Sequence, residues 1–175
     1  PLFNTYTEME QGELRDSIIA MAQANGVPAD NVYVYDRSRQ TNSISANVSG
    51  MFGTTRISLA DTLLDRASPE AVRAVMAHEI GHYVLGHTYS ILAMMAGLVV
   101  ILFAIVHFGF RALAKNERWG IRDIADPAGL PLIMVILSVA GLFTAPIQRN
   151  IVYFHEQQAD MFGLNAAREP DGFAE

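Results

Sequence analysis

His78-Glu79-Ile80-Gly81-His82 is the most informative stretch of the chain, because the residues around it have the signals of a helix. Two histidines four residues apart fall on one helical face, offset by about 40° with roughly 6 Å of rise. Both imidazoles can therefore reach one metal ion, with Glu79 at the flank of that ion. This HExxH arrangement supplies two ligands and a general base for metal-assisted hydrolysis.

The flanking residues predict a helix over 69–88. Ser68 is a suitable N-cap, Pro69 suits the first helical position, and Glu70 favours the helix dipole. Apolar residues then recur at helical spacing, namely Val72, Val75, Met76 and Ile80. Cap, period and motif agree, so we interpret the histidines as metal ligands rather than as surface residues of an ordinary amphipathic helix.

An open zinc site needs a third protein ligand. Glu156 is our candidate, and Asp160, one turn later, can accept the free ring N–H of a liganding histidine. The competing candidate is His87, which would imitate the three-histidine pattern of the metzincins. That pattern places the third histidine six residues after the second, whereas His87 lies five after His82, a rotation of about 140°. We therefore expect His87 at a helix end or on the surface.

The chain is rich in apolar residues for its 175-residue length: 51% are hydrophobic and 17% are charged, with a mean hydropathy of +0.21. The excess lies in residues 91–110 and 130–147, uncharged runs of 20 and 18 residues. About 20 apolar residues cross a hydrocarbon core of about 30 Å. We predict two transmembrane helices joined by the polar loop 111–129, with two buried helices of a soluble protein as the alternative.

The apolar runs and the metal motif constrain each other. Glu156 lies 74 residues after His82, and both runs lie between them. Two crossings return the chain to its starting side, so Glu156 can meet the histidines, whereas one crossing would separate them. Within the loop, Trp119 is placed as an interfacial anchor, and four Lys/Arg residues weakly favour an inside location for the loop.

The first 68 residues have the pattern of a soluble α+β module. An amphipathic helix is expected over 10–24, ending near Asn25-Gly26, and a helical turn is expected around 61–66. Strands are expected at 31–36, 43–49 and 56–59. A strand beside the active-site helix can hold an extended substrate by edge pairing, and either 43–49 or 56–59 could serve, with Ser45 and Ala46 as candidate residues. Ordinary sheet structure explains both strands equally well.

These segments together resemble the type 1 CAAX prenyl proteases and their HtpX-like relatives, which are integral-membrane zinc metallopeptidases. The matching stretches include two strand signatures, the active-site helix and the second zinc motif: Pro1-Leu2-Phe3-Asn4, Gly12-Glu13-Leu14-Arg15, Asp36-Arg37-Ser38-Arg39, Arg56-Ile57-Ser58-Leu59-Ala60-Asp61-Thr62-Leu63-Leu64, His78-Glu79-Ile80-Gly81-His82, Gly86-His87-Thr88 and Glu156-x-x-Ala159-Asp160. The resemblance implies zinc on His78, His82 and Glu156, with Glu79 as base and Asp160 hydrogen-bonded to a ligand.

Two departures from the family pattern bear on the substrate rather than on the zinc. Ser45-Ala46 stands where the family usually has Asn-Ala, and Val152-Tyr153 stands where it tends to have Ser-Arg. His155 is expected to point away from the metal, because it is the neighbour of Glu156. The chain begins with Pro1 rather than Met, and we expect further spans upstream and a helical region downstream, as in the family.

The sequence thus predicts an α+β fold, a zincin-like metallopeptidase core with an active-site helix and small sheet, interrupted by a two-helix transmembrane hairpin. The expected parts are 1–68, 69–88, 89–148 and 149–175. The expected function is a membrane-embedded zinc endopeptidase that hydrolyses prenylated CAAX-type or membrane-protein substrates with zinc-activated water, using one Zn²⁺ per chain.

The expected location is a bacterial inner membrane or the endoplasmic reticulum, with the lipid bilayer as a partner. The resemblance implies a cytosolic active site, which is the opposite of the orientation that the loop charges favour. The alternatives are a catalytically silent membrane protein with a structural or regulatory zinc site, and a soluble zincin. The chain has no cysteine, which excludes disulfides, thiolate ligands and cysteine-protease chemistry. A net charge of −6 without a basic aromatic patch argues against nucleic acid.

Overall fold

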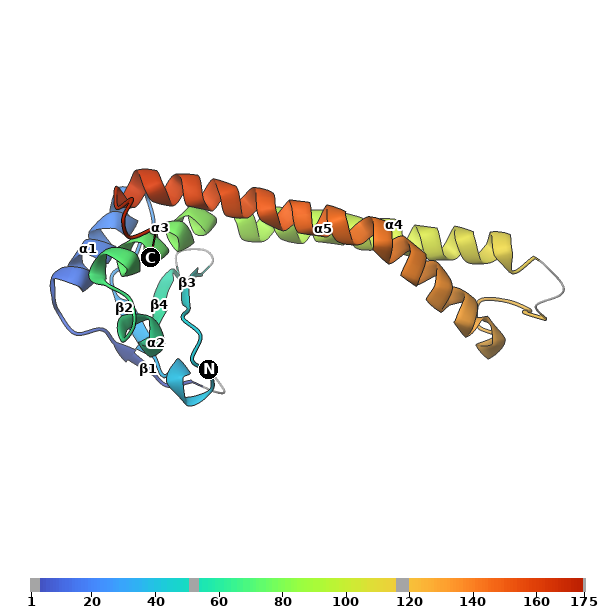
Figure 1. The fold of residues 1–175 in the computed structure, drawn as a ribbon, viewed down its shortest axis with the longest axis horizontal. Coiled ribbons are helices and arrows are strands. Elements are labelled where there is room, and N and C mark those ends of the chain that lie inside the picture. The colour runs from blue at the N-terminus through green and yellow to red at the C-terminus, as the bar shows by residue number, and fades with distance from the viewer. Residues whose placement is uncertain (1–3, 51–53, 116–119, 175) are drawn as a thin grey trace. The chain divides into compact units, whose positions relative to one another are not determined.

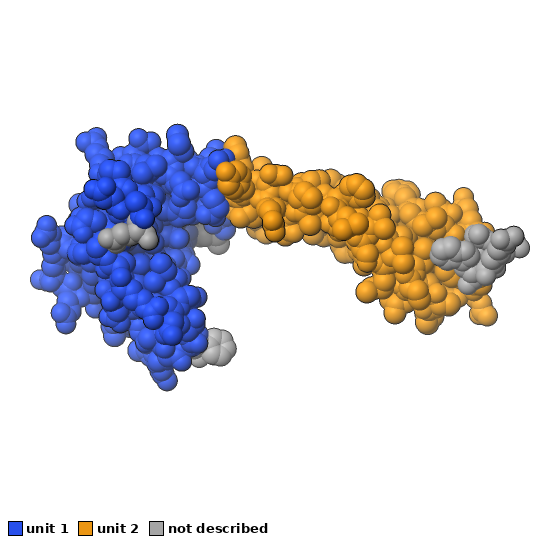
Figure 2. Space-filling model, in the orientation of Figure 1, with its two compact units in different colours: residues 1–88, 155–175 blue, residues 89–154 orange. Residues whose placement is uncertain are grey.

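A computed structural model describes residues 4–50, 54–115 and 120–174. It divides into two compact units, Pro1–Thr88 with His155–Glu175, and Tyr89–Phe154 (Figure 2). The first unit holds a sheet and short helices, and the second holds long apolar helices, as an α+β core interrupted by a helical hairpin requires. The expected anchor Trp119 lies outside the described residues.

A four-stranded sheet in the order β1-β2-β4-β3 organises the first unit (Figure 1). Its strands are β1 Tyr6–Glu8, β2 Val32–Tyr35, β3 Ala46–Ser49 and β4 Arg56–Ala60. The central pair, β2 and β4, is parallel, and both outer pairs are antiparallel. Three strands were expected from the sequence and β1 was not. Strand β3 forms one edge of the sheet, which leaves its outer side for other partners.

The segment 36–39 was expected to belong to a strand and does not. Strand β2 ends at Tyr35, and Arg37–Arg39 form the 3-10 turn η1. The side chains explain the turn: Asp36 accepts a hydrogen bond from Arg39 Nη1 at 3.0 Å and another from the Thr5 amide at 2.7 Å. These two bonds hold the pKa of Asp36 below its usual range, with the Thr5 amide contributing most.

The core of this unit packs the sheet against helices α1 Glu13–Ala24 and α3 Pro69–Val84, while the short helix α2 Asp61–Leu64 follows β4. Its fully buried side chains come from both helices and from the two central strands: Ile18, Val32, Ile57, Leu59, Met76 and Ile80. Each such burial contributes roughly 1.5–3 kcal/mol. Helix α1 ends where expected, because Gly26 takes a φ of 78° directly after the C-cap Asn25.

Helix α3 begins as the sequence indicates and ends earlier than expected. The Ser68 hydroxyl accepts a hydrogen bond from the Ala71 amide at 3.1 Å, and Pro69 fills the first helical position. Gly86 then takes a φ of 66°, a conformation that favours glycine and interrupts the helix. The chain restarts as α4 at His87, so the expected single helix over 69–88 is two helices.

Helix α5, Leu130–Ala167, is longer than the apolar run 130–147 and the part 149–175, which were expected as separate segments. It continues through Pro146 and carries both the second apolar run and Glu156. Its final turns lie against α3 at two glycines: a Cβ on Gly163 would lie 3.1 Å from the His78 backbone nitrogen, and one on Gly81 would lie 3.0 Å from Phe162 Cδ1. The absence of these side chains lets the two helices approach closely.

The second unit begins at Tyr89, within helix α4 (His87–Leu113). It continues through the 3-10 turn η3 (Pro127–Gly129) and ends at Phe154, within α5. A small cluster forms around Phe110, Leu132 and Ile136. In the most apolar 18-residue windows of the two long helices, 0% and 17% of residues are buried. Both helices are long and apolar enough to cross a membrane.

Candidate metal centre

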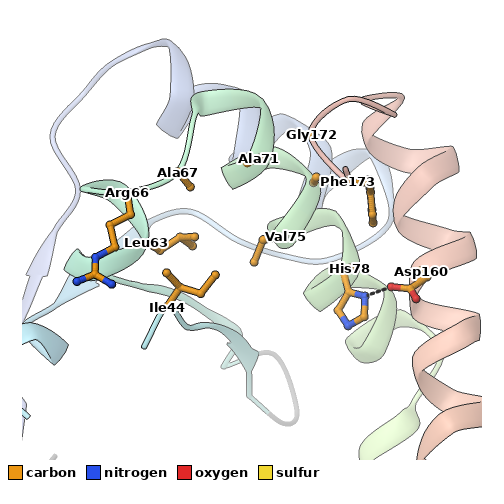
Figure 3. Close-up of a pocket in the computed structure, with 11 residues that line it drawn as sticks. Ile44, Leu63, Arg66, Ala67, Ala71, Val75, His78, Asp160, Gly172 and Phe173 are labelled. Atoms are coloured by element: carbon orange, nitrogen blue, oxygen red, sulfur yellow. Dashed lines mark hydrogen bonds and ion pairs between the residues drawn. The ribbon is translucent and has the colours of Figure 1, made fainter. Parts of the chain in front are cut away.

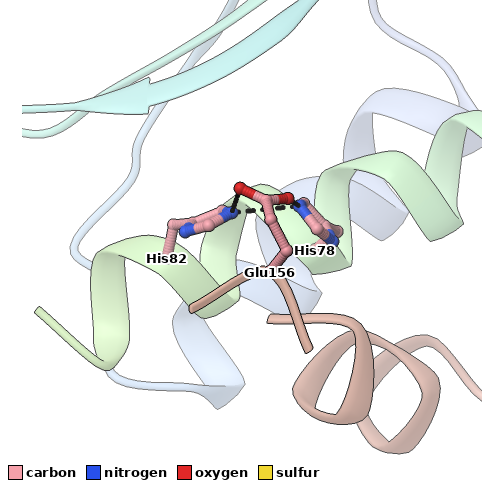
Figure 4. A group of neighbouring side chains, drawn as sticks. All are labelled: His78, His82 and Glu156. Atoms are coloured by element: carbon pink, nitrogen blue, oxygen red, sulfur yellow. Dashed lines mark hydrogen bonds and ion pairs between the residues drawn. The ribbon is translucent and has the colours of Figure 1, made fainter. Parts of the chain in front are cut away.

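His78 and His82 of α3 face Glu156 and Asp160 of α5, and the members of each pair are four residues apart in the sequence. His78 and His82 come from α3, and Glu156 from α5 points between them (Figure 4). His78 Nε2 lies 3.3 Å from Glu156 Oε2, His82 Nε2 lies 3.6 Å from Glu156 Oε1, and the two Nε2 atoms are 3.0 Å apart. One ligand atom from each residue therefore lies within 4.8 Å of the others.

Asp160 orients the first histidine. Its Oδ1 lies 2.8 Å from His78 Nδ1 (Figure 3), whereas Glu156 lies near Nε2 of the same ring. A carboxylate accepts a hydrogen bond at this distance, so Nδ1 carries the proton and Nε2 presents its lone pair to the centre. The structure therefore places Asp160 beside a histidine, as expected from its position one turn after Glu156.

His87 contacts the second histidine. Its Nδ1 lies 2.8 Å from His82 Nδ1, and its Nε2 lies 3.2 Å from Gln158 Oε1. When His82 Nε2 binds a metal, His82 Nδ1 carries the proton and donates to His87 Nδ1. His87 then carries its own proton on Nε2 and donates to the Gln158 carbonyl. With one tautomer for each ring, the His82–His87 and His87–Gln158 contacts each have one donor and one acceptor.

His87 lies at a helix end, one of its two expected positions, and it is buried rather than on the surface. It is the first residue of α4 and only 2% exposed. Helix α5 explains the burial, because Gln158 and His155 both contact it. The His155 ring packs edge-on against the His87 ring with centroids 4.8 Å apart and is also 2% exposed. His155 is absent from the ligand group found among the described residues.

Glu79 lies between His78 and His82 in the sequence and is partly buried. Burial raises its pKa, the negative Glu156 acts in the same direction, and His78 opposes them. A carboxylate whose pKa is raised toward neutrality is a more effective proton acceptor and donor near pH 7. Burial also lowers the pKa of His82, which keeps that imidazole neutral, as a metal ligand must be.

The donor set fits a catalytic zinc ion. Two imidazole nitrogens and one carboxylate oxygen form the three-ligand His₂Glu set of open zinc sites, whereas structural sites are usually closed by four protein ligands. Within the described part of the chain this group has three members. Both histidines also have a hydrogen-bond partner for the nitrogen that faces away from the centre. Such partners commonly accompany liganding histidines.

Strand β3 presents an open backbone edge, and the candidate residues Ser45 and Ala46 lie at its start. The Ser45 carbonyl accepts a hydrogen bond from the Ala60 amide at 2.9 Å. Because antiparallel pairing alternates, the backbone N–H and C=O of Ala46 are directed away from β4. Among the described residues β3 pairs with β4 alone, so its outer edge can accept an extended peptide.

Comparison with known proteins identifies the family. The model of "Peptidase family M48" matches residues 8–175. The chain belongs to peptidase family M48. The resemblance to CAAX prenyl proteases is confirmed: the CAAX prenyl protease 1 homolog of Dictyostelium discoideum is 43% identical over 173 residues, covering 94% of this chain. The uncharacterized metalloprotease YhfN of Bacillus subtilis is 30% identical over 166 residues, also covering 94% of the chain.

A solved structure extends the comparison to the fold. The crystal structure of S. mikatae Ste24p superposes with a TM-score of 0.71 at 28% identity, covering 98% of this chain and 43% of that one. The chain spans 39% of the length of both relatives above. The predicted fold class, an α+β metallopeptidase core with two apolar helices inserted, is therefore confirmed for this M48 chain.

His87→Phe is expected to weaken zinc binding by about 10–100-fold, because the phenyl ring fills the same space without accepting the His82 proton. Competition with a chelating dye measures the affinity. Tyr89→Phe is the control, since Tyr89 is 60% exposed on the same helix. Equal zinc affinity in the two variants would show that His87 packs against His82 without orienting it.

Proposed function

We propose that this chain is the catalytic core of a membrane-embedded zinc metalloendopeptidase. The observation that carries the proposal is the meeting of His78, His82 and Glu156 within 4.8 Å, with Glu79 adjacent in the sequence to His78. Membership of a peptidase family supports it, as do relatives named as proteases. The test is peptide hydrolysis by wild type and by Glu79→Gln, with the cleaved bonds identified by mass spectrometry.

In this proposal each residue has one task. His78, His82 and Glu156 hold a single zinc ion, which when bound polarises the scissile carbonyl and lowers the pKa of water. Glu79 accepts the proton of the attacking water and then delivers it to the leaving amine. Asp160 and His87 keep the two histidines in the tautomer that presents Nε2, and Ala46 pairs with the substrate backbone.

We further propose that α4 and the first part of α5 cross a bilayer as a hairpin. The side chains exposed along them are large and apolar, among them Leu92, Val100, Phe103, Phe108, Leu142 and Phe143. Exposure of this apolar surface to water is unfavourable, whereas contact with apolar lipid tails is favourable. Substrates are then prenylated CAAX-type proteins, which the names of several relatives suggest, or other membrane proteins, and the active centre lies on the cytosolic side.

Cysteine labelling tests the hairpin directly, because the natural chain has no cysteine. Cysteines at Tyr89 and Gln148 are expected to react with an impermeant maleimide from the same side of sealed vesicles, and one at Ala125 from the opposite side. The two-crossing arrangement requires this pattern. Reaction of all three positions from one side would contradict it. Disrupting the vesicles with detergent checks that each cysteine is reactive.

A further inference from the structure

A cavity of about 390 Å³ lies within the second unit, beside the C-terminal end of helix α4. We call it the hairpin pocket. Three basic side chains line it: Arg111 from the last turn of α4, Lys115 shortly after that helix, and Arg122 from the segment before η3. Figure 1 shows this end of α4 in yellow. The volume lies within the range of about 300–1,000 Å³ that is usual for ligand pockets.

Packed apolar side chains hold the walls of the hairpin pocket together. Phe110 lines the pocket, is 2% exposed and belongs to the cluster that joins α4 to α5. A Cβ on Gly129 would lie 2.7 Å from Phe110 Cζ, so the absence of a side chain lets η3 approach α4 closely. Ile121 packs against the same cluster. Arg111 and Arg122 directly follow Phe110 and Ile121 in the sequence, so this packing holds both cations at the pocket.

The carboxylates near the pocket accept hydrogen bonds from backbone amides. Asp123 lines the pocket, and its Oδ1 accepts the amide two residues later at 2.7 Å. Asp126 accepts the amide two residues later at 3.0 Å and the amide of Arg122 at 3.1 Å. Within the described part of the chain, the ion pairs found include none with Arg111, Lys115 or Arg122. Three basic side chains therefore share one cavity with one carboxylate.

The helix dipole alone does not explain this arrangement. Cations are favoured near the C-terminus of a helix, which accounts for Arg111 and Lys115. Arg122 lies outside α4, yet it lines the same cavity. Like charges from two segments thus converge on one space, where an anion would relieve their repulsion.

We propose that the hairpin pocket binds the phosphate group of an anionic phospholipid, with Arg111, Lys115 and Arg122 as its donors. The inference goes beyond peptide hydrolysis and rests on the proposed crossing of the bilayer by α4 and α5. The uncharged run 91–110 ends immediately before Arg111, so the cations lie where hydrocarbon ends and lipid phosphates begin. Arginine suits this ligand because its planar guanidinium can donate two parallel hydrogen bonds to a phosphate.

Apolar side chains beside the cations favour a lipid over a free phosphate ion. Ile124 lines the pocket and is 50% exposed, and Phe108 is 68% exposed beside His107 of the pocket. An acyl chain would cover such surfaces, whereas inorganic phosphate leaves them in water. The net charge of −6 opposes a general attraction of the chain to anionic lipid. A preference for anionic lipid would therefore point to the pocket itself.

The test is native mass spectrometry of wild type released from uncharged detergent micelles that contain dioleoylphosphatidylglycerol or dioleoylphosphatidylcholine. The two lipids share their acyl chains, and the choline headgroup adds a positive charge that the pocket repels. We expect one phosphatidylglycerol per chain, bound about 10–100-fold more tightly than phosphatidylcholine, as charge-assisted hydrogen bonds allow. Inorganic phosphate at the same concentration as the lipid should not displace it.

Substitutions identify the residues responsible. The double variant Arg111→Gln/Arg122→Gln should lose the preference for phosphatidylglycerol, and Lys115→Gln, at an exposed position, should lose part of it. Arg37→Gln/Arg39→Gln is the matched control, because it removes two charges from η1, outside the pocket. Far-UV circular dichroism checks that both double variants are folded.

Equal affinities of wild type for the two lipids, or equal losses in the two double variants, would overturn the inference. Displacement of phosphatidylglycerol by equimolar inorganic phosphate would assign the pocket to a free anion and overturn the lipid assignment. The cysteine labelling of the hairpin is read separately. Its expected pattern without a lipid preference overturns this inference alone, whereas reaction of all three cysteines from one side counts against both.

Discussion

Replacing Glu79 with Gln is expected to leave zinc bound while peptide hydrolysis falls by about 10²–10⁴-fold. Glutamine keeps the shape and the hydrogen-bonding reach of glutamate and removes the basic oxygen. The proposed ligands are His78, His82 and Glu156, and the substitution touches none of them. Because burial raises the pKa of Glu79, the lost group is one suited to accept and return a proton near neutrality.

The measurement pairs metal content with turnover on the same purified sample. Normal zinc content with greatly reduced hydrolysis assigns Glu79 as the base. It also separates an enzyme from a silent zinc protein, because a structural site has no use for this carboxylate. Hydrolysis at the wild-type rate in Glu79→Gln would mean that another group moves the proton and that the mechanism is wrong.

Replacing Glu156 with Gln should weaken zinc binding by about one to two orders of magnitude, because a neutral amide replaces the single anionic ligand. Glu156 lies 3.3 Å from His78 Nε2 and 3.6 Å from His82 Nε2, so its carboxylate is central to the group. Hydrolysis should fall with zinc occupancy and recover partly when excess zinc is supplied.

Equilibrium dialysis followed by metal analysis gives the zinc content. Glu10→Gln is the control, since it makes the same chemical change at an exposed position before α1. Undiminished zinc binding in Glu156→Gln would remove Glu156 from the site and leave the two histidines without their proposed third partner.

Local signals explain what the sequence predicted well. The start of α3 depends on Ser68 and Pro69, which act on the turn they begin, so these residues sufficed to locate the helix. The end of α1 likewise depends on Asn25 and Gly26. The sequence could predict that Glu156 meets His78 and His82. The i, i+4 spacing places each set of side chains on one helical face, and two apolar runs return the chain to the side on which it started.

The features that were missed depend on contacts between distant segments. Strand β1 has only three residues, two of them exposed, and it is held by pairing with β2 rather than by its own propensity. The apolar run 130–147 and the segment from 149 were expected as separate parts, yet α5 continues from Leu130 through Pro146 to Ala167. The burial of His87 depends on Gln158, which lies 71 residues later, so no local pattern reports it.

The order of the ligands along the chain makes the centre a late product of synthesis. His78 and His82 leave the ribosome before the apolar residues of α4, whereas Glu156 follows those of α5. A nascent chain therefore holds two of three ligands until both apolar helices have been made. In the proposed site, the three ligands are therefore present together only in polypeptides whose hairpin has been made. A chain that ends before Glu156 would lack the third proposed ligand.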